Sequence, residues 1–435
     1  MINLIVELSK YLLLILAALY TLESFSVFKY KAEDDKRYIL RKQLIVIFFM
    51  DFVAFLVIFL KTEKMEVIYF FGAQLLYFIV VQVLYRIFYK KASLLLLNHM
   101  CMLLSVGFIM LARLDTESAV RQFQIVVIAT VIAMVIPVMI RKLTFLNKWT
   151  WFYAGAGMLL LLVVLVLGKN VNGAKINISL GGFAFQPSEF AKVAVILLLT
   201  YVITNSEKRQ DSLLHMAGTM ALLLPIVGLV GTNNLSTAII ILGIGVILIF
   251  VSNPKYLPFV GIGGVGVLFI GIFLSMASYR LERIAIWRNP EKYEKGFQTI
   301  QGLYAIGSGG IFGKGLGSSL QKLGFVPEAQ NDMIFSIICE ETGLIGACLL
   351  ILVFALLIWR LMVIATHARD LCGALIAAGI MGHMAIQVIL NIAVVTNTIP
   401  NTGITLPFVS YGGTSVLFLM GEMGLALSVS RTRSP

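Results

Sequence analysis

The sequence predicts an all-α, polytopic membrane protein, and its composition and the spacing of its apolar runs both indicate this class. Of its 435 residues, 59% are hydrophobic and 13% are charged, whereas charged residues make up roughly 25% of a typical soluble domain. The mean hydropathy is +0.95. Apolar runs of about 20 residues, which is the length that crosses a bilayer as a helix, recur from one end of the chain to the other.

About thirteen such runs can be counted, so we expect about thirteen transmembrane helices. They fall near residues 3–25, 43–60, 67–85, 94–112, 122–140, 149–168, 189–204, 213–230, 237–251, 257–276, 333–358, 371–395 and 412–430. The long intervening segments are 169–188, 277–332 and 396–411. We expect these three segments to be irregular and to lie outside the bilayer core.

Lysine and arginine recur in every second loop, and this bias sets the orientation of the helices. The chain has 34 Lys and Arg against 22 Asp and Glu. Basic loops begin with the one that holds Arg37 and Lys42, and the series ends at Arg431 and Arg433. We therefore expect the N-terminus outside, the C-terminus in the cytoplasm, and the three long segments on the outer face.

The same composition excludes other classes of protein. The basic residues are scattered over many loops, so no nucleic-acid-binding patch is expected. The cysteines are Cys101, Cys339, Cys348 and Cys372, and all lie in or at the ends of apolar runs. Neither a disulfide framework nor a metal cluster is expected from them.

The glycine-rich stretch 296–346 does not resemble a membrane helix over most of its length, and we expect it to hold the chemical site. Its charged residues include Lys314, Glu328 and Asp332. A long loop adds ordering cost without burying a core, so it is typically kept for function. Its run 307–314 lacks the spacing of a P-loop, although its backbone N–H groups could still face phosphate oxygens.

Three segments of the predicted outer face carry motifs in a fixed order. The first contains Asn172-Gly173-Ala174-Lys175 and Phe185-Gln186-Pro187-Ser188-Glu189, the second runs from Tyr279-Arg280-Leu281-Glu282-Arg283 to VPEAQNDMIFSIICEETG, and the third contains Pro400-Asn401-Thr402-Gly403 and LPFVSYGGTS. With these motifs the chain resembles the FtsW/RodA/SpoVE family, the SEDS proteins, over roughly residues 94–431. The run GKGLGSSLQK favours the FtsW/SpoVE branch.

The resemblance implies a ten-helix core in residues 93–435, preceded by an extension of about three helices in residues 1–92. It implies a peptidoglycan glycan-strand polymerase of the bacterial plasma membrane, acting in division, elongation or sporulation. Such an enzyme performs inverting glycosyl transfer from lipid II and releases the polyprenyl pyrophosphate. The resemblance also implies a partner, a single-pass transpeptidase of the class B penicillin-binding proteins.

The chain departs from the family pattern at several positions. An arginine and a tryptophan of the family are Ile176 and Asn177 here, a carboxylate is Asn234, and a histidine is Gln330. No tryptophan or carboxylate chemistry is therefore expected at those positions.

Glycan polymerisation needs a base for the attacking sugar hydroxyl and positive charge for the departing pyrophosphate. The four histidines lie within or beside spans or in a cytoplasmic loop, so we expect a carboxylate of the outer loops. Asp332 lies where the long loop re-enters the membrane, where partial burial makes a carboxylate a better base, and the resemblance implies the same residue. Because Asp332 directly precedes an apolar helix, an N-cap role is an equal alternative, and the two roles can coexist.

Other residues of the outer segments are candidates for substrate binding. The cations best placed to receive a pyrophosphate are Lys175, Arg280, Arg283, Lys314 and Lys322. Positive residues on an outer face run against the usual bias, although each alone is also compatible with a solvated or interfacial charge. Gln186, Glu328 and Ser410 lie in the motifs and complete the expected set.

Glu189 and Lys192 are three residues apart at the start of a helix, so their side chains share a face. An ion pair between them and a substrate role are equal alternatives. The pair could hold a sugar hydroxyl, or a phosphate through a bridging divalent cation such as Mg²⁺ or Mn²⁺; no other cofactor is expected. Inside the spans, Glu340 and Glu341 are expected to form ion pairs within the bundle.

The main alternative function is a transporter that flips the lipid-linked precursor across the membrane. A transporter is expected to place ionisable residues near the bilayer midplane and to contain paired broken helices. Here the polar residues concentrate in outer loops and no repeat is visible, which favours the enzyme. A scaffold role in a cell-wall complex is compatible with either. The glycines of the run 257–276, among them Gly264 and Gly271, permit close helix packing or contact with a partner.

Overall fold

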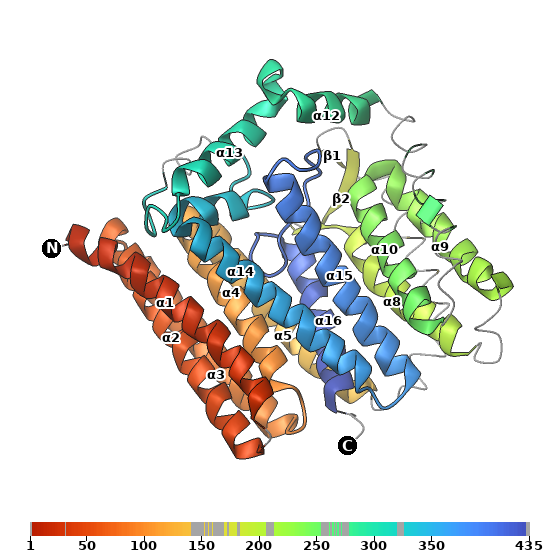
Figure 1. Cartoon of the computed structure of the whole chain (residues 1–435), viewed down its shortest axis with the longest axis horizontal. Coiled ribbons are helices and arrows are strands. Elements are labelled where there is room, and N and C mark those ends of the chain that lie inside the picture. The colour runs from red at the N-terminus through yellow and green to blue at the C-terminus, as the bar shows by residue number, and fades with distance from the viewer. Residues whose placement is uncertain are drawn as a thin grey trace. The chain divides into compact units, whose positions relative to one another are not determined.

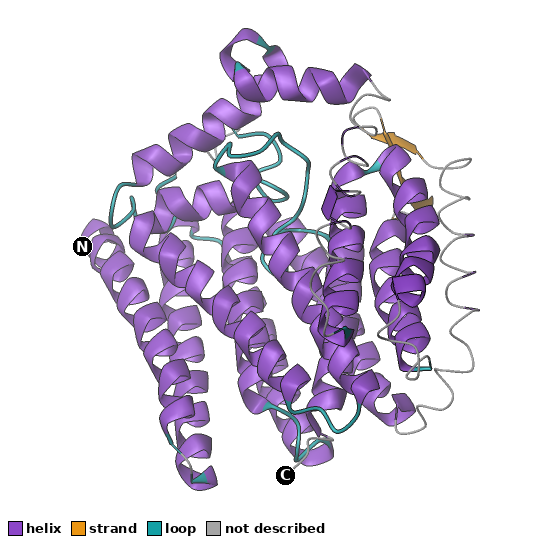
Figure 2. Ribbon diagram, turned by 45° about the vertical axis from the view of Figure 1, so that its right-hand side comes forward, coloured by secondary structure: helices purple, strands orange, loops and turns teal. Residues whose placement is uncertain are grey.

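The computed structural model describes residues 2–30, 32–140, 169–171, 174–180, 183–205, 213–253, 278–319 and 326–431, with isolated residues between 152 and 271. Helices dominate the described chain (Figure 2). Ten described helices are long and apolar enough to cross a membrane, which confirms the polytopic α-helical class. A shorter apolar helix covers Met216–Thr232. The expected spans 149–168 and 257–276 lie almost wholly outside the described residues, so the number thirteen stays a prediction.

The chain forms two compact units, each assembled from separate stretches of sequence. Unit 1 comprises residues 1–127, 286–360 and 390–412, and unit 2 comprises residues 128–285, 361–389 and 413–435. The division at residue 92 that we expect from the family resemblance is of a different kind and stays a prediction.

Unit 1 is built around helix α4 (Leu94–Leu114), most of which is buried. Its neighbours α1 (Ile2–Lys29), α2 (Glu33–Thr62) and α3 (Met65–Phe88) form a bundle with it, in which α2 contacts α1, α3 and α4 (Figure 1). Helix α2 begins ten residues before the expected span at 43, because Glu33, Asp34 and Asp35 supply a negatively charged first turn that suits the positive end of the helix dipole.

Unit 2 contains α8 (Pro187–Thr204), α9 (Leu213–Asn233), α10 (Leu235–Ser252) and α16 (Gly413–Arg431), with α8 in contact with the other three. Helices α5 (Thr116–Ile140), α14 (Ile334–Thr366) and α15 (Leu371–Val395) each contribute residues to both units. All the spans named here agree with the apolar runs of the sequence within a few residues at most ends.

The expectation of an irregular segment at 169–188 is wrong. It contains a three-stranded antiparallel sheet of β1 (Lys169–Val171), β2 (Ala174–Leu180) and β3 (Phe183–Phe185), in the order β1-β2-β3. The physical reason lies in β2, where lysine, asparagine and serine alternate with isoleucine, isoleucine and leucine. This period of two is the pattern of a strand.

The segment 277–332 is also more regular than expected, because it contains α12 (Ser278–Arg288) and α13 (Phe297–Gly309), with two short 3₁₀ turns, Pro290–Lys292 and Glu294–Gly296, between them. In α13, Thr299, Gly302, Ala305 and Gly309 are buried at helical spacing. A Cβ atom on Gly309 would lie 2.1 Å from the carbonyl oxygen of Cys339 in α14, so the two helices touch backbone to backbone. The third segment, 396–411, contains neither helix nor strand, as expected.

Candidate functional site

Asp332 lies in the turn that leads into α14 and is 8% exposed. Gln298, at the start of α13, donates from Nε2 to Asp332 Oδ1 over 3.3 Å and to the carbonyl oxygen of Pro327 over 3.3 Å. Asn391 of α15 donates from Nδ2 to the carbonyl oxygen of Asp332 over 2.9 Å. Two amide side chains therefore fix the carboxylate and the backbone of Asp332. Whether Asp332 also caps α14 stays open.

The segment 396–411 joins the same cluster. The Asn391 side chain also donates to the carbonyl oxygen of Ile404 over 2.6 Å, and Asn401 Nδ2 donates to Gln298 Oε1 over 3.2 Å. The backbone N–H of Tyr411 donates to the carbonyl oxygen of Gln330 over 2.8 Å. Asp332 is thus the meeting point of the start of α13, the turn before α14 and the segment 396–411.

Ser410 stabilises this arrangement from within the protein. It is 2% exposed, its Oγ accepts from the backbone N–H of Leu406 over 2.8 Å, and its carbonyl oxygen accepts from Gln122 Nε2 over 3.1 Å. A Cβ atom on Gly107 of α4 would lie 2.5 Å from the carbonyl oxygen of Phe408, so this turn is seated directly on α4. These contacts give Ser410 a structural role, and its contact with substrate stays a prediction.

Glu328 orders the turn that carries Asp332. Its residue is exposed and its φ of 55° is in the left-handed region, which a glutamate adopts only when its surroundings fix it. Asn331 Nδ2 donates to the Glu328 carboxylate, and the backbone N–H of Asn331 donates to the Glu328 carbonyl oxygen over 3.0 Å. A substrate contact of Glu328 stays a prediction.

Lys314 belongs to the glycine-rich loop 310–319 that follows α13, and it is paired within the protein. Its Nζ lies 2.7 Å from Glu340 Oε1, and the Glu340 side chain is fully buried. Ser319 donates its hydroxyl to the other oxygen of Glu340. The ion pair that we expect for Glu340 is confirmed. The expected pyrophosphate contact of Lys314 stays a prediction, with its ammonium group already neutralised.

Glu341 acts on the same loop. Its Oε1 accepts from the backbone N–H groups of Gly317 and Ser319 over 3.0 and 3.3 Å, and it lies 3.4 Å from Nη2 of Arg113. The N–H groups of Gly313 and Lys314 donate to carbonyl oxygens of the protein over 2.9 Å each. The expectation that this run faces phosphate with free N–H groups is therefore wrong for Gly313 and Lys314, because the protein's own acceptors use them.

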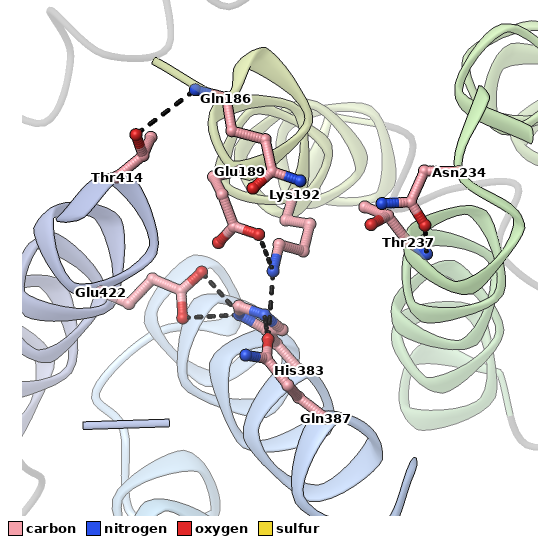
Figure 3. A network of polar contacts seen from close by, with 9 residues as sticks. All are labelled: Gln186, Glu189, Lys192, Asn234, Thr237, His383, Gln387, Thr414 and Glu422. Carbon is pink, nitrogen blue, oxygen red and sulfur yellow. Dashed lines mark hydrogen bonds and ion pairs between the residues drawn. The ribbon is translucent and has the colours of Figure 1, made fainter. Parts of the chain in front are cut away.

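Glu189 and Lys192 form the ion pair that their spacing predicts. In α8, Lys192 Nζ lies 2.8 Å from Glu189 Oε1, and the residues are 1% and 6% exposed, respectively. Lys192 also donates to Gln387 Oε1 of α15 over 3.0 Å. The pair is thus embedded in unit 2 and is linked to a second helix (Figure 3).

The contacts continue from Gln387 to His383 and Glu422. His383 Nε2 lies 2.7 Å from Gln387 Oε1, and its Nδ1 lies 2.8 and 2.9 Å from the two carboxylate oxygens of Glu422 in α16 (Figure 3). Because Gln387 Oε1 already accepts from Lys192, the proton on Nε2 is the donor. The contact of Nδ1 with a carboxylate then holds one further proton. Two positive and two negative groups can balance along this chain.

These residues are a poor fit for a divalent cation. Glu189 Oε2 is a buried oxygen with no hydrogen-bond partner, so one carboxylate oxygen is available. The ammonium group of Lys192 lies against the same carboxylate and would repel a metal ion. Within the described ranges, no group of three or more His, Cys, Asp or Glu residues is arranged to hold a metal. No step of the chemistry below depends on one.

The remaining predicted residues are placed only in part. Lys175 lies in β2 and Arg280 in α12, but their side chains are not among those described, and Lys322 lies outside the described residues. Arg283 is half-buried on α12. The backbone N–H of Gln186 donates to Thr414 Oγ1 of α16 over 3.3 Å (Figure 3). Their roles at a substrate stay predictions.

Sequence reasoning missed several amide residues of these clusters. Gln298 and Asn401 lie in or beside the quoted motifs, yet uncharged amides suggest no catalytic role by themselves. His383, Gln387 and Asn391 recur at intervals of four along the apolar helix α15. Polar residues spaced one turn apart on an apolar helix share a face, and this spacing is the signal that could have found them.

Comparison with known proteins identifies the family. The family model FtsW/RodA/SpoVE, described as "Cell cycle protein", matches residues 86–435. The chain is similar to "Stage V sporulation protein E" of Bacillus subtilis, with 41% identity over 303 residues, 66% of this chain and 81% of the relative. It is also similar to "Probable peptidoglycan glycosyltransferase FtsW" of Trichlorobacter lovleyi, with 37% identity, covering 65% of this chain and 76% of the relative.

Solved structures agree with these relatives. One, described as "Structural coordination of polymerization and crosslinking by a peptidoglycan synthase complex", matches with a TM-score of 0.66 and 28% identity, over 79% of this chain and 98% of that chain. The rod shape determining protein RodA of Thermus thermophilus matches with a TM-score of 0.59 and 26% identity, over 79% of this chain and 98% of that chain. The chain therefore belongs to the FtsW/RodA/SpoVE family, as its motifs predict.

Proposed function

We propose that this protein is a peptidoglycan glycosyltransferase that polymerises glycan strands from lipid II at the outer leaflet of the bacterial plasma membrane. The observation that carries the proposal is the setting of Asp332: a nearly buried carboxylate held by Gln298 where three extramembrane segments meet. Relatives named as peptidoglycan glycosyltransferases, 37% identical over most of their length, support the reaction class.

In the proposed reaction, the Asp332 carboxylate accepts the proton of the attacking sugar hydroxyl. The oxygen of that hydroxyl forms the new bond to the anomeric carbon of the donor, on the face opposite the leaving group. The bond from that carbon to the pyrophosphate breaks, and the electron pair leaves with the polyprenyl pyrophosphate. The configuration at the anomeric carbon is therefore inverted, and one proton is transferred for each bond formed.

The chain's own residues divide the work in this proposal. Gln298 orients the carboxylate through Oδ1, and Asn391 fixes the backbone that carries it. Burial excludes water from the carboxylate, which strengthens it as a proton acceptor. The positive charge for the departing pyrophosphate comes from outer-face cations, for which we propose Lys175, Arg280, Arg283 and Lys322. Glu189 and Lys192 are proposed to contact the substrate from unit 2.

The orientation and partner belong to the same proposal. The N-terminus lies outside and the C-terminus in the cytoplasm, so that Asp332 faces the outer leaflet. The chain makes glycan strands but carries no segment that resembles a transpeptidase, so a class B penicillin-binding protein crosslinks them. The similar solved structure of a complex that coordinates polymerisation and crosslinking supports this arrangement.

One observation favours a second function, transport of the lipid-linked precursor. The chain of contacts from Glu189 through His383 to Glu422 places charged groups inside α8, α15 and α16. Ionisable residues inside transmembrane helices are typical of proton relays and transport pathways. The enzyme remains the better supported function because the family's relatives carry the name of the glycosyltransferase.

The two functions are separated by giving the purified protein lipid II. In detergent, a polymerase converts lipid II to glycan strands that migrate as a ladder on a gel. In sealed vesicles, a flippase moves labelled lipid II to the other leaflet without lengthening it. Strands in detergent support the proposal; movement without strands would transfer the function to the alternative.

A further inference from the structure

The three N-terminal helices α1–α3 precede nearly all of the region that the family model covers, which begins at residue 86. They are nevertheless joined to α4 by buried polar contacts. Gln82 donates to Asn98 over 2.8 Å, Asn98 donates to Gln43 over 3.0 Å, and Tyr20 Oη lies 2.8 Å from His99 Nδ1. Inside an apolar bundle such hydrogen bonds hold helices in one register. The extension is therefore a fixed part of unit 1.

Two of these helices reach the glycine-rich loop 310–319. Lys61, in the last turn of α2, donates from Nζ to Ser318 Oγ over 2.7 Å. On α1, the ring of Tyr11 lies 5.7 Å from the ring of Phe312, measured between centroids. The side chain of Lys10 lies against Gly315, where a Cβ atom would be 3.8 Å from it.

The fit at Gly317 is tighter still. Its φ is +83°, and a Cβ atom there would lie 2.6 Å from Lys61 Cδ and 3.1 Å from Arg113 Nε. The loop backbone therefore passes directly over these two cations. Arg113 is paired with Glu341, which in turn accepts from the N–H groups of Gly317 and Ser319.

The loop is thus held between two sets of groups in unit 1. Glu340 and Glu341 of α14 bind it from one helix, and Lys61 and Tyr11 of the extension contact it from others. The same α14 begins directly after the turn that carries Asp332. A change in how the loop is held would move cations of the loop region relative to a donor bound at that turn.

We infer that the N-terminal extension positions the glycine-rich loop of the polymerase, with Lys61 as the positioning residue. The part of this inference that concerns catalysis rests on the proposed function; the part that concerns the loop does not. Because Lys61 acts on the loop and not on the reacting atoms, its loss should raise the KM for lipid II more than it lowers kcat.

The test compares Lys61→Met with Lys61→Arg, which keeps the charge and a donor, and with Lys64→Met, a matched change at an exposed lysine in the turn after α2. Hydrogen exchange of the full-length protein is measured at the amides of residues 317 and 319, with thermal stability beside it. For Lys61→Met we expect exchange at these amides to rise about 10-fold, in line with the loss of a hydrogen bond from a charged donor. Stability, and both other variants, should match the unchanged protein.

The KM and kcat for lipid II are measured on the same variants. A KM raised several-fold by Lys61→Met alone, with kcat nearly unchanged, supports the catalytic part. Unchanged exchange at both amides in Lys61→Met overturns the inference, and so does an equal rise in Lys64→Met. If the unchanged protein makes no glycan strands, the proposed function fails, while the exchange result still decides the role of the extension.

Discussion

Removing the positive charge of Lys192 tests whether the Glu189–Lys192 pair is a structural ion pair, a substrate site or both. Both residues are less than a tenth exposed and their charged atoms lie 2.8 Å apart. Lys192→Met keeps a long apolar side chain but leaves the Glu189 carboxylate buried without its counter-ion. Breaking a buried pair from one side typically destabilises a protein by about 3–5 kcal/mol.

The magnitude depends on what remains around the carboxylate. Lys192 is the cation paired with Glu189 in the described contacts of unit 2, and Glu189 Oε2 already has no hydrogen-bond partner. Little can therefore compensate for the lost charge, and we expect the upper part of the range. Changing both residues, Glu189→Gln with Lys192→Met, removes both charges together. The double variant should regain most of the lost stability, because an uncharged pair leaves no isolated charge in the bundle.

The assay is the free energy of unfolding of the purified protein in mixed micelles, followed by lipid II polymerisation by each variant that folds. A double variant that is stable but inactive assigns the pair a substrate role beyond its structural one; a stable and active one leaves only the ion pair. The reasoning is refuted if Lys192→Met is as stable as the unchanged protein. It is also refuted if the double variant is as destabilised as the single one, because lost packing, not an unpaired charge, would then explain the effect.

Three further predictions follow from the fold and the orientation. Gly309→Ala should lower stability by about 1–3 kcal/mol, because its Cβ atom would overlap a backbone oxygen of α14, whereas Gly307→Ala, whose Cβ atom meets nothing within 4 Å, should not; equal effects in thermal unfolding would contradict this packing. Ser308→Cys should react with an impermeant thiol reagent added outside the cell, and Ser434→Cys should react only after permeabilisation; the reverse pattern would place the site in the cytoplasm. Gly264→Leu should leave thermal stability unchanged, since a Cβ atom there meets no described atom within 4 Å, yet weaken co-purification of the transpeptidase; lost stability with normal co-purification would indicate internal packing instead.

The sequence predicts the helical architecture and the pairing of Glu189 with Lys192 because both depend on local spacing. Hydropathy over about 20 residues defines a span, and three residues along a helix define a shared face. The strand β2 has an equally local signal, the alternation of residues 175–180. It was overlooked because a strand is not expected among membrane helices.

The surroundings of Asp332 could not be predicted in the same way. Gln298, Asn391 and Asn401 reach that cluster across 34, 59 and 103 residues of sequence, with Asn401 bonded to Gln298. No periodicity connects positions so far apart, and uncharged amides give no charge pattern. The role of Lys61 is hidden for the same reason, since its partner Ser318 is 257 residues away.

The measurement that tests the central claim most directly is glycan polymerisation by Asp332→Asn. Asparagine has nearly the same shape, can cap a helix as well as aspartate, and can accept from Gln298 through its side-chain oxygen. It cannot take a proton from a sugar hydroxyl at neutral pH. The variant should therefore fold and insert normally, with unchanged thermal stability, while its rate of strand formation from lipid II falls about 10²–10⁴-fold, the usual contribution of a general base. A variant that makes strands at nearly the normal rate would contradict the account and leave Asp332 with a structural role alone.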